Sequence, residues 1–351
     1  MDVTVAVVAF NEEANISDCL KAIQAQTYRL GAIEILVIDG RSTDRTRELV
    51  AEAARNDSRI RLLDNPARQI AAGRNIALLG ARFPFLAFTD ADCRPPSHWL
   101  ETLVAGWKRV QRDHPRLAGV GGGNRPPLEE SEFLNALGLY LDSTLGSLGS
   151  VQGRNFPFAC PVASVGCFNA LFDRQVLQEV GGFDASLGNM GEDLEIGCRL
   201  RRAGFELWYV PGAEVIHRLR SDLFAWGRNM FAYGQGRAEV SLRHHQLGNR
   251  FFLAAWAYAL TLMGAAQGRW PKARALLTLY VGLVVAYTGG LAWLAKRSHL
   301  WPRVAVIFLV THFAYGCGMV LGTIRGAVKA VLGDGPLAWV RSPRLQAIAK
   351  R

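Results

Sequence analysis

Two kinds of apolar pattern alternate along the first 90 residues, and this alternation restricts the folds that the chain can adopt. Short continuous apolar runs, rich in Val and Ile, are typical of strands buried on both faces of a sheet. The segments between them carry apolar residues at helical spacing. We expect strands over 3–9, 33–38, 60–63 and 85–88 and helices over 16–25, 46–54 and 70–79, the first helix capped by Ser17. This order predicts an α/β fold with helices on both faces of a parallel sheet.

Polar residues stand where three of these strands end. Asn11, Asp39 and Asp90 follow the first, second and fourth predicted strands. In sheets of this kind, ligands bind outside the carboxyl ends of the strands. We therefore expect the three side chains to meet at one edge of the sheet and to line a ligand site.

The triplet Asp90-Ala91-Asp92 lies at the end of the fourth strand. Two carboxylates that flank one residue at a turn can face a single divalent cation, or one can bind the cation and the other a ribose hydroxyl. Mg²⁺ and Mn²⁺ suit such a site because they are hard ions that prefer carboxylate and phosphate oxygens. A D-x-D triplet alone is common by chance, so its position at a strand end carries the inference.

Motifs that the sequence lacks disfavour several classes of protein. No G-x-G-x-x-G follows the first strand and no G-x-x-x-x-G-K-[ST] occurs, which disfavours dinucleotide dehydrogenases and P-loop NTPases. Phosphate would then be held by a metal ion and by Arg. The six cysteines form no C-x-x-C pair, so we expect free thiols in a reducing compartment. We expect no signal peptide, because the apolar run after Asp2 is short and has no basic residue before it.

The chain carries 40 Lys and Arg against 30 Asp and Glu, a net charge of +10. Such a charge fits a basic surface, anionic lipid, a phosphorylated substrate or nucleic acid. The basic residues are dispersed and no nucleic-acid-binding motif is present, so we do not expect nucleic acid as a partner.

Three runs without a charged residue lie in the last third of the chain, over 251–268, 275–295 and 304–324. Each is about as long as a helix that crosses the hydrocarbon core of a bilayer. A soluble domain would have to bury all three helices on every side, which favours membrane-spanning helices. Two or three crossings both stay open, because the first run is the shortest. Basic residues on both sides of the runs leave the orientation undecided: Arg269, Lys272, Arg274, Lys296, Arg297, Arg303, Arg325, Lys329, Arg341 and Arg344.

The segment before these runs has its own helical pattern, in which Leu223, Trp226, Met230 and Tyr233 recur at helical spacing. It is either an amphipathic helix in the headgroup region of a membrane or a helix packed on the soluble domain. We expect an α/β domain over 1–221, this linking helix over 222–250, two or three transmembrane helices over 251–325 and a basic tail over 326–351.

Five motifs in the α/β domain occur in an order that resembles the family 2 glycosyltransferases, which have a GT-A fold built on a Rossmann-like mixed sheet. The resemblance covers about the first 220 residues. The motifs are Phe10-Asn11-Glu12-Glu13, Asp39-Gly40-Arg41-Ser42-Thr43-Asp44, Ala72-Gly73-Arg74-Asn75, Thr89-Asp90-Ala91-Asp92, and Gly181-Gly182-Phe183-Asp184 followed by Glu192-Asp193.

The resemblance implies a binding site for a nucleotide-sugar donor and a divalent cation, Mg²⁺ or Mn²⁺. The cation and the diphosphate would be held by Asp90 and Asp92, and His217 matches a position where some members carry a metal-binding His. Asp193 matches the usual catalytic base. The nucleotide would lie against Phe10, Asn11, Glu12, Asp39, Gly73 and Arg74.

The chemistry of glycosyl transfer fits these roles. A diphosphate leaving group gains negative charge that a metal ion can stabilise. A hydroxyl acceptor must lose a proton, which a carboxylate within hydrogen-bonding distance can take. Structural roles stay open for several residues. Asp193 could only complement a helix dipole, Asp39 could cap a turn, His217 could be structural, and Arg218 with Arg220 could be either a solvated patch or a phosphate clamp.

These patterns predict a membrane-anchored, inverting, metal-dependent glycosyltransferase. It would move one sugar, from a UDP-sugar by expectation, to a hydroxyl of a lipid-linked saccharide in cell-surface polysaccharide or glycolipid synthesis. The order of domains is similar to that of bacterial exopolysaccharide glycosyltransferases of the succinoglycan type. The region 226–230 lacks the Q-x-x-R-W motif of processive synthases. The catalytic domain would lie on the cytoplasmic face of the inner membrane, where nucleotide sugars are made.

Two other functions compete with this one. A polyprenyl-phosphate sugar transferase would use a phosphate oxygen as acceptor and would need no base. A non-catalytic membrane subunit would keep the fold without the activity, although the intact acidic set Asp39, Asp90, Asp92 and Asp193 argues against it.

Overall fold

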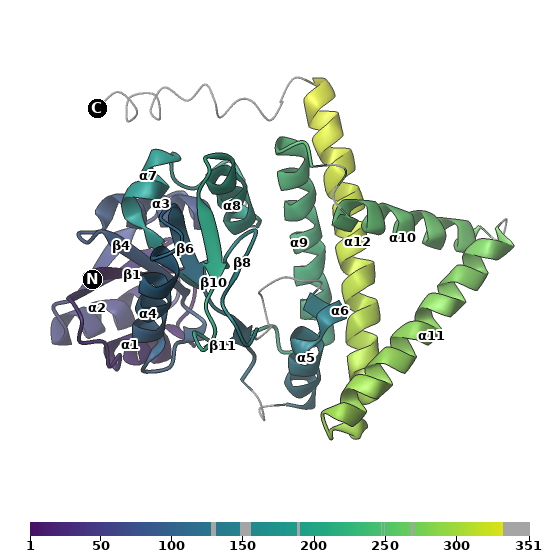
Figure 1. Ribbon diagram of the computed structural model, residues 1–351, viewed down its shortest axis with the longest axis horizontal. Helices are drawn as coiled ribbons and strands as arrows, with labels where there is room; N and C mark the ends of the chain where they lie inside the picture. The colour runs from purple at the N-terminus through teal and green to yellow at the C-terminus, as the bar shows by residue number, and fades with distance from the viewer. Residues whose placement is uncertain are drawn as a thin grey trace. The chain divides into compact units, whose positions relative to one another are not determined.

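The computed structural model describes residues 1–127, 131–147, 156–187, 190–246, 248, 250–267 and 270–332. Contacts within the chain divide it into two compact units (Figure 1). The first, here called the α/β unit, comprises Met1–Leu128 and Leu141–Leu219. The second, the helical unit, comprises Glu129–Tyr140 and Arg220–Arg351.

The α/β unit contains an eight-stranded sheet in the order β3-β2-β1-β4-β9-β6-β10-β8. Strands β3, β2, β1 and β4 are parallel, whereas β9 is antiparallel to both of its neighbours and β8 is antiparallel to β10. The mixed sheet is therefore as expected. The strands are β1 Val3–Ala9, β2 Ile33–Asp39, β3 Ile60–Asp64, β4 Phe85–Asp90, β6 Leu117–Gly121, β8 Cys160–Pro161, β9 Asn169–Asp173 and β10 Glu206–Tyr209.

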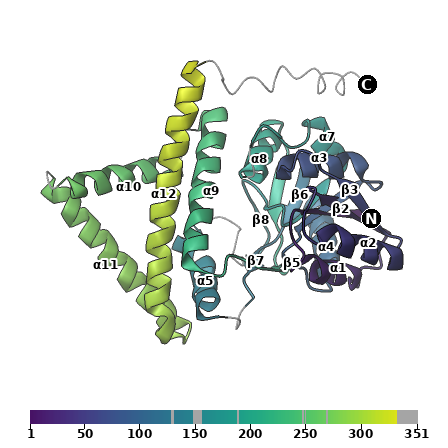
Figure 2. The same ribbon diagram turned by 180° about the vertical axis from the view of Figure 1, so that it is seen from behind.

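Helices cover both faces of this sheet (Figures 1 and 2). One hydrophobic core contains Ile16, Val50 and Trp99 from α1, α2 and α4, and a second core on the other face contains Ala77, Leu177 and Ile196 from α3, α7 and α8. Burial of a large apolar side chain contributes about 1.5–3 kcal/mol, so these two cores fix the layers. The helices of these two layers are α1 Ile16–Gln24, α2 Thr46–Asn56, α3 Ile70–Gly80, α4 Trp99–Gln111, α7 Arg174–Glu179 and α8 Glu192–Arg202. Two further helices are α5 Glu132–Asp142, most of which belongs to the helical unit, and the short α6 Thr144–Ser147.

All seven elements predicted for the first 90 residues are present and begin at the predicted residues. The predicted N-cap was wrong, because Ser17 lies inside α1 and the N-cap position is Asn15. The turn after β1 leads directly into the helix, since the backbone N–H groups of Asn15 and Ile16 both donate to the carbonyl of Glu12. These backbone hydrogen bonds start α1 at Ile16 without a side-chain cap.

A second, three-stranded sheet joins segments that are far apart in the sequence. Its order is β5-β11-β7, formed by Cys93–Arg94, Val215–His217 and Asn124–Arg125. The pairing of β11 with β5 sets His217 opposite Cys93 (strands β5 and β7 are labelled in Figure 2). This small sheet therefore brings the end of the D-x-D segment next to the predicted metal-binding His.

The helical unit contains four long helices, α9 Leu223–Arg243, α10 Arg250–Ala266, α11 Pro271–Leu294 and α12 Trp301–Leu332, with the short 3-10 helix η1 Ser298–Leu300 before α12. In the described part of the chain, two helical segments are long and apolar enough to cross a membrane, Pro271–Leu294 and Ser298–Val328. The apolar part of α10, Phe252–Ala266, is shorter than a helix that crosses the hydrocarbon core of a bilayer. Most of the predicted basic tail, over 333–351, and the connector residue Arg269 lie outside the described residues.

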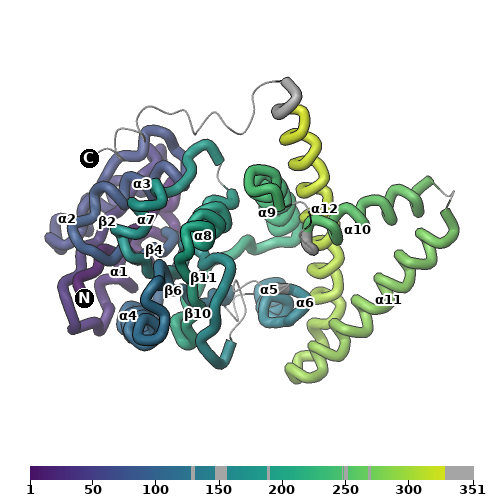
Figure 3. Tube along the Cα trace, turned by 45° about the horizontal axis from the view of Figure 1, so that its top comes forward, coloured from purple at the N-terminus to yellow at the C-terminus, as the bar shows by residue number. Residues whose placement is uncertain are grey.

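Helix α9 packs along α12 in a parallel direction (Figure 3). The Trp226 indole N–H donates to Thr311 Oγ1 at 2.8 Å near the start of this contact. Farther along, a Cβ atom added at Gly322 would lie 2.9 Å from the Cβ of Ala238, and one added at Gly318 would overlap the backbone carbonyl of Phe231. Neither alternative for segment 222–250 foresaw a helix held against α12 by small residues.

Replacing Gly318 by Ala should separate α9 from α12, because the new methyl group meets backbone atoms that cannot rotate away. We expect a loss of about 1–3 kcal/mol in the stability of the helical unit, the usual cost of overpacking. Thermal unfolding of the detergent-purified protein measures this loss.

The matched control is Gly289→Ala in α11, where an added Cβ has no atom within 4 Å. This change should be neutral or should stabilise the helix by up to about 1 kcal/mol. Equal unfolding temperatures for the two variants would contradict close packing between α9 and α12.

Candidate active site

The loop after β1 is tied to the loop after β2 by hydrogen bonds at the carboxyl edge of the sheet. The backbone N–H of Asn11 donates to Ser42 Oγ at 2.9 Å, and the N–H of Thr43 donates back to Asn11 Oδ1 at 2.8 Å. The N–H of Glu12 donates to Thr46 Oγ1 at 2.7 Å. Two predicted nucleotide-binding residues, Asn11 and Glu12, therefore lie in a pair of loops joined by hydrogen bonds, here called the double loop.

Asp39 lies beneath this double loop and is fully buried. Its carboxylate accepts hydrogen bonds from Ser42 Oγ at 2.5 Å and from Arg47 Nη1 at 2.7 Å. Asp39 thus caps the turn, which was the structural alternative. Contact with a base or ribose is not excluded by this role and stays a prediction. Arg47 had no role in the sequence analysis, and its position in the first turn of α2 gave no signal.

Phe10 is the exposed aromatic residue of this edge, with 46% of its surface accessible. The guanidinium of Arg68 lies over its ring, 5.8 Å from the centroid. A cation over one face of a ring is attracted by the π electrons. The pair forms a flat surface of the kind on which a nucleotide base can stack.

Three residues near the ends of β1, β2 and β3 have a left-handed backbone, Asn11 at φ 55°, Arg41 at φ 59° and Arg68 at φ 57°. Asn adopts this conformation readily, whereas Arg does so rarely. Each such residue costs of order 1–3 kcal/mol and persists only where its surroundings hold it, which happens most often at functional sites. Their gathering at one edge marks it as a binding edge.

Arg74 lies at the centre of the site and is 4% exposed. Its Nη1 donates to the Glu192 carboxylate, and its Nη2 lies 3.6 Å from Asp90 Oδ1. The rings of Phe88 and Phe183 lie 6.0 and 5.8 Å from the guanidinium carbon. Arg74 therefore joins α3 to the end of β4 and to the start of α8.

The neighbouring Gly73 has a packing role. A Cβ at this position would lie 2.9 Å from Val8 Cγ1 and 3.0 Å from Asn65 Nδ2. The absence of a side chain lets α3 approach β1 closely and so sets the depth of Arg74. Its predicted contact with the nucleotide stays a prediction.

Asp193 stands in the first turn of α8, next to Glu192, and is half-buried. Burial and the charge of Glu192 raise the pKa of Asp193 to about 7, while the Arg74 cation opposes this rise. The helix-dipole alternative also holds, since α8 is acidic in its first turn and basic in its last. A carboxylate that titrates near neutral pH can take up a proton at working pH, as a general base must.

Asp90 belongs to the same electrostatic cluster. Burial raises the pKa of its carboxyl group, and the Arg74 cation opposes this effect. The charge of Asp92 raises the pKa of Asp90 further, and the charge of Asp90 itself raises that of Asp193. Asp90 and Asp193 therefore share one site with Arg74, and Asp92 is coupled to this site through Asp90.

Asp92, Cys93 and His217 bring their ligand atoms within 4.8 Å of one another. His217 Nε2 lies 3.2 Å from Asp92 Oδ1, and the side chains are 12% and 19% exposed. Burial raises the pKa of the Cys93 thiol well above its usual value. Of this group the sequence analysis named Asp92 and His217, and Cys93 was missed although it directly follows the D-x-D triplet.

The surroundings of His217 fit a metal ligand. The carbonyl oxygen of the buried Asn124 side chain has no hydrogen-bond partner among the residues that the structure describes, and Asn124 Nδ2 lies 3.0 Å from His217 Nδ1. A half-turn of the amide would let Nδ1–H donate to that oxygen and leave Nε2 free to bind an ion. A metal-binding His almost always donates its other ring N–H in this way.

Asn169 holds together the segments that lead into β7 and β11, the strand that carries His217. The sequence analysis also missed this residue. Its amide nitrogen donates to the carbonyls of Gly123 and Ala213, at 2.7 and 2.5 Å, and its oxygen accepts from Trp99 Nε1 at 2.7 Å. The only signal in the sequence is a polar residue at the start of an apolar strand. Arg218 follows His217 directly, and its guanidinium donates to Asn15 Oδ1 at 3.0 Å.

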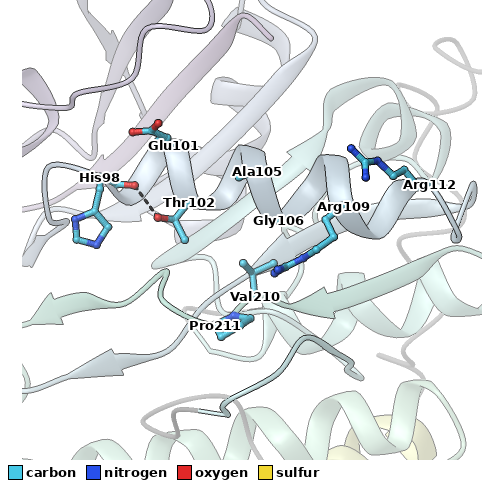
Figure 4. Close-up of a pocket in the computed structure, with 9 residues that line it drawn as sticks. All are labelled: His98, Glu101, Thr102, Ala105, Gly106, Arg109, Arg112, Val210 and Pro211. Carbon is cyan, nitrogen blue, oxygen red and sulfur yellow. Dashed lines mark hydrogen bonds between the residues drawn. The ribbon is translucent and has the colours of Figure 1, made fainter.

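A cavity of about 560 Å³ lies along α4 (Figure 4). The Thr102 hydroxyl at its rim donates to the His98 carbonyl at 2.9 Å. None of the predicted site residues lines it, so it adds no candidate for the site. Its lining residues are His98, Glu101, Thr102, Ala105, Gly106, Arg109, Arg112, Val210 and Pro211.

The chain is similar in sequence to two curated proteins over nearly the whole length of each. It is 28% identical over 326 residues to the succinoglycan biosynthesis protein ExoA of Rhizobium meliloti (strain 1021), covering 90% of this chain and 92% of that one. It is 22% identical to the dolichyl N-acetyl-alpha-D-glucosaminyl phosphate 3-beta-D-2,3-diacetamido-2,3-dideoxy-beta-D-glucuronosyltransferase of Methanococcus voltae, covering 92% and 98%.

Among solved structures, the chain is similar to the mannosyltransferase PcManGT of Pyrobaculum calidifontis in complex with GDP-Man and Mn²⁺. The TM-score is 0.57 at 22% identity, covering 88% of this chain and 86% of that one, which is a likeness of fold. The profile of the family described as glycosyl transferase family 2 matches residues 4–181, just over half of the chain. The protein therefore belongs to glycosyl transferase family 2 and is a glycosyltransferase with the GT-A fold.

Proposed function

We propose that this glycosyltransferase is an inverting enzyme that uses a divalent cation and a nucleotide-sugar donor, a UDP-sugar by expectation. It transfers one sugar to a hydroxyl group of a lipid-linked saccharide during the synthesis of a cell-surface polysaccharide or glycolipid. The observation that carries the proposal is an acidic cluster at the buried cation of Arg74. Asp90 and Asp193 lie in the field of this cation, and Asp92 lies close enough to Asp90 to raise its pKa.

The donor side of the proposal rests on the edge that holds Phe10, Asn11 and Asp39. The exposed ring of Phe10 offers a stacking surface, and the backbone around Asn11 is held in a fixed conformation. The nucleotide would lie over this edge. Its diphosphate would then point toward Asp90, because the strand ends of β1 and β4 are neighbours.

The residues that would hold the cation are Asp92 and His217, with Asp90 beside them. The buried Asn124 oxygen without a partner supports this assignment, since metal binding by His217 Nε2 would give it one. A bound divalent cation would offset the negative charge that the diphosphate gains as the glycosidic bond breaks. The likeness to a structure with Mn²⁺ makes Mn²⁺ or Mg²⁺ the first ion to test.

The acceptor side rests on Asp193. With a pKa near 7, its carboxylate is ionised for much of the time at neutral pH and can accept the proton of an attacking hydroxyl. Attack from the side opposite the leaving diphosphate inverts the anomeric centre. Asp193 then holds the proton, and the diphosphate leaves with the pair of electrons of the broken bond.

The lipid-linked acceptor and the membrane are supported by the helical unit and by the relatives. Helices α11 and α12 are long and apolar enough to cross a bilayer, which would hold the site near membrane-bound substrates. A relative that covers nearly the whole chain is named for succinoglycan biosynthesis. The proposed location is the cytoplasmic face of the inner membrane, because nucleotide sugars are made in the cytoplasm.

Donor binding should depend on the cation and on Asp92. We expect Mn²⁺ and one class among UDP-, GDP- and dTDP-sugars to stabilise the wild type by about 2.7 kcal/mol at a donor concentration of about 100 Kd. The variants Asp92→Ala and His217→Ala should lose this stabilisation, because each removes a ligand of the ion. Thermal shift of the detergent-purified protein measures the effect.

The matched control is Asp113→Ala, which removes an exposed carboxylate beyond the end of α4. It should leave the stabilisation intact. A shift that Asp92→Ala and His217→Ala retain would disprove the proposed cation site. The absence of any shift in the wild type would favour the non-catalytic alternative.

The variant Asp193→Asn should lower the rate of transfer by about 10²–10⁴-fold, because the amide cannot accept the proton. For the wild type, kcat/KM should level off above pH 7 and fall about tenfold per unit below it. Transfer assays across this pH range measure both effects.

Asp193→Asn should fold well. Donor binding by this variant is the control, because it shows that a loss of transfer does not come from unfolding. A raised pKa in the folded state means that Asp193 stabilises the protein below its unfolded pKa and loses this contribution as the pH rises through about 7. The Asn variant should therefore be at least as stable as the wild type at pH 8. Full activity of Asp193→Asn would instead support a phosphate acceptor, as in a polyprenyl-phosphate sugar transferase.

A further inference from the structure

Cys93 is the unexplained member of the cluster beside the D-x-D triplet. It is fully buried, and strand pairing sets it opposite His217. Its Sγ lies 3.9 Å from Asp92 Oδ1, and the ligand atoms of all three residues lie within 4.8 Å of one another. One sulfur, one nitrogen and one oxygen atom therefore lie close enough together to be candidate ligands of a single ion.

A site built only for a hard ion would contain oxygen ligands, whereas this set of ligands includes a thiol. Mg²⁺ and Mn²⁺ prefer carboxylate, phosphate and water oxygens, and they gain little from a thiol. Zn²⁺ binds thiolate, imidazole and carboxylate ligands in tetrahedral geometry, and three protein ligands leave one position open. The described residues thus supply the three ligands of an open zinc site.

We propose that Asp92, Cys93 and His217 form a Zn²⁺ site, in which Zn²⁺ displaces the hard cation from the ligands that the two ions share. Binding forms a zinc–sulfur bond and releases the thiol proton of Cys93 to solvent. Zinc would then occupy the cation site with three protein ligands and one open position, fewer open positions than a six-coordinate Mg²⁺ or Mn²⁺ offers to a diphosphate. Inhibition by zinc rests on the proposed function, whereas zinc binding itself does not.

Asn124 gives this site an independent sign of a ligand. It is 5% exposed, and its side-chain oxygen is buried without a hydrogen-bond partner next to the His217 ring. When Nε2 binds an ion, the ring proton is held on Nδ1, which can then donate to that oxygen, so metal binding selects the tautomer that gives the oxygen a partner. Asn124 is thus a positioning residue for the imidazole.

The test titrates the detergent-purified full chain with Co²⁺, a spectroscopic substitute for Zn²⁺. We expect a near-ultraviolet thiolate-to-cobalt charge-transfer band that disappears when Zn²⁺ is added. Competition with a coloured chelator then gives the Zn²⁺ affinity. In Cys93→Ser the band should vanish and the Zn²⁺ affinity should fall by more than about tenfold, with a much smaller change in the Mn²⁺ affinity.

The matched control is Cys160→Ser, a half-buried cysteine on β8 outside the cluster. It should keep both the band and the zinc affinity. If Cys93→Ser does not fold, Cys93→Ala replaces it, and the spectrum of the wild type alone still decides whether sulfur binds the ion. Asn124→Ala should weaken Zn²⁺ binding by about 10–100-fold while it keeps the charge-transfer band.

A cobalt complex without the charge-transfer band, or an equal Zn²⁺ affinity in wild type and Cys93→Ser, would overturn the proposal. These readouts need neither donor nor acceptor. A missing band together with Mn²⁺-dependent donor binding would leave the proposed function intact. A normal band without donor binding would leave the zinc site intact and remove the proposed function.

Discussion

The site depends on one buried cation. Arg74 is almost inaccessible to solvent, and a charge in such a place costs several kcal/mol unless it is paired. Its partners, Glu192 and Asp90, come from α8 and from the end of β4, so the ion pairs hold three elements in one arrangement. The same positive charge moderates the pKa values of Asp90 and Asp193, because both carboxyl groups lie within its field. The geometry and the acidity of the site therefore have a common origin.

Local patterns were enough to predict the first half of the sheet. Strands buried on both faces leave continuous apolar runs, and the helices between them leave a helical period, so the predicted starts of β1 to β4 agree with the structure. The strands β2, β3 and β4 end one or two residues later than predicted. The antiparallel insertion of β9 between β4 and β6 has no local signature, because it depends on pairing between distant segments. The short strands β8 and β11 also form by pairing with distant segments, so their sequences do not predict them.

The candidate site could be predicted only in part, for the same reason. Asp39 and Asp90 follow apolar strands, and a general rule about strand ends finds them. His217 came from the family resemblance alone, since nothing in the sequence shows that β11 pairs with β5. Asn124 and Cys93 were missed, because an isolated amide and an isolated thiol carry no pattern until the fold brings them to an imidazole.

The left-handed residues Asn11, Arg41 and Arg68 have a consequence for how this enzyme can change. Gly at the two Arg positions would relieve an unfavourable backbone and would raise the stability of the folded α/β unit. It would also remove the guanidinium over Phe10 and free the loops to move. Stability and the rigidity of the proposed donor edge are thus in a trade-off, so variants selected only for heat resistance would be expected to lose function at this edge first.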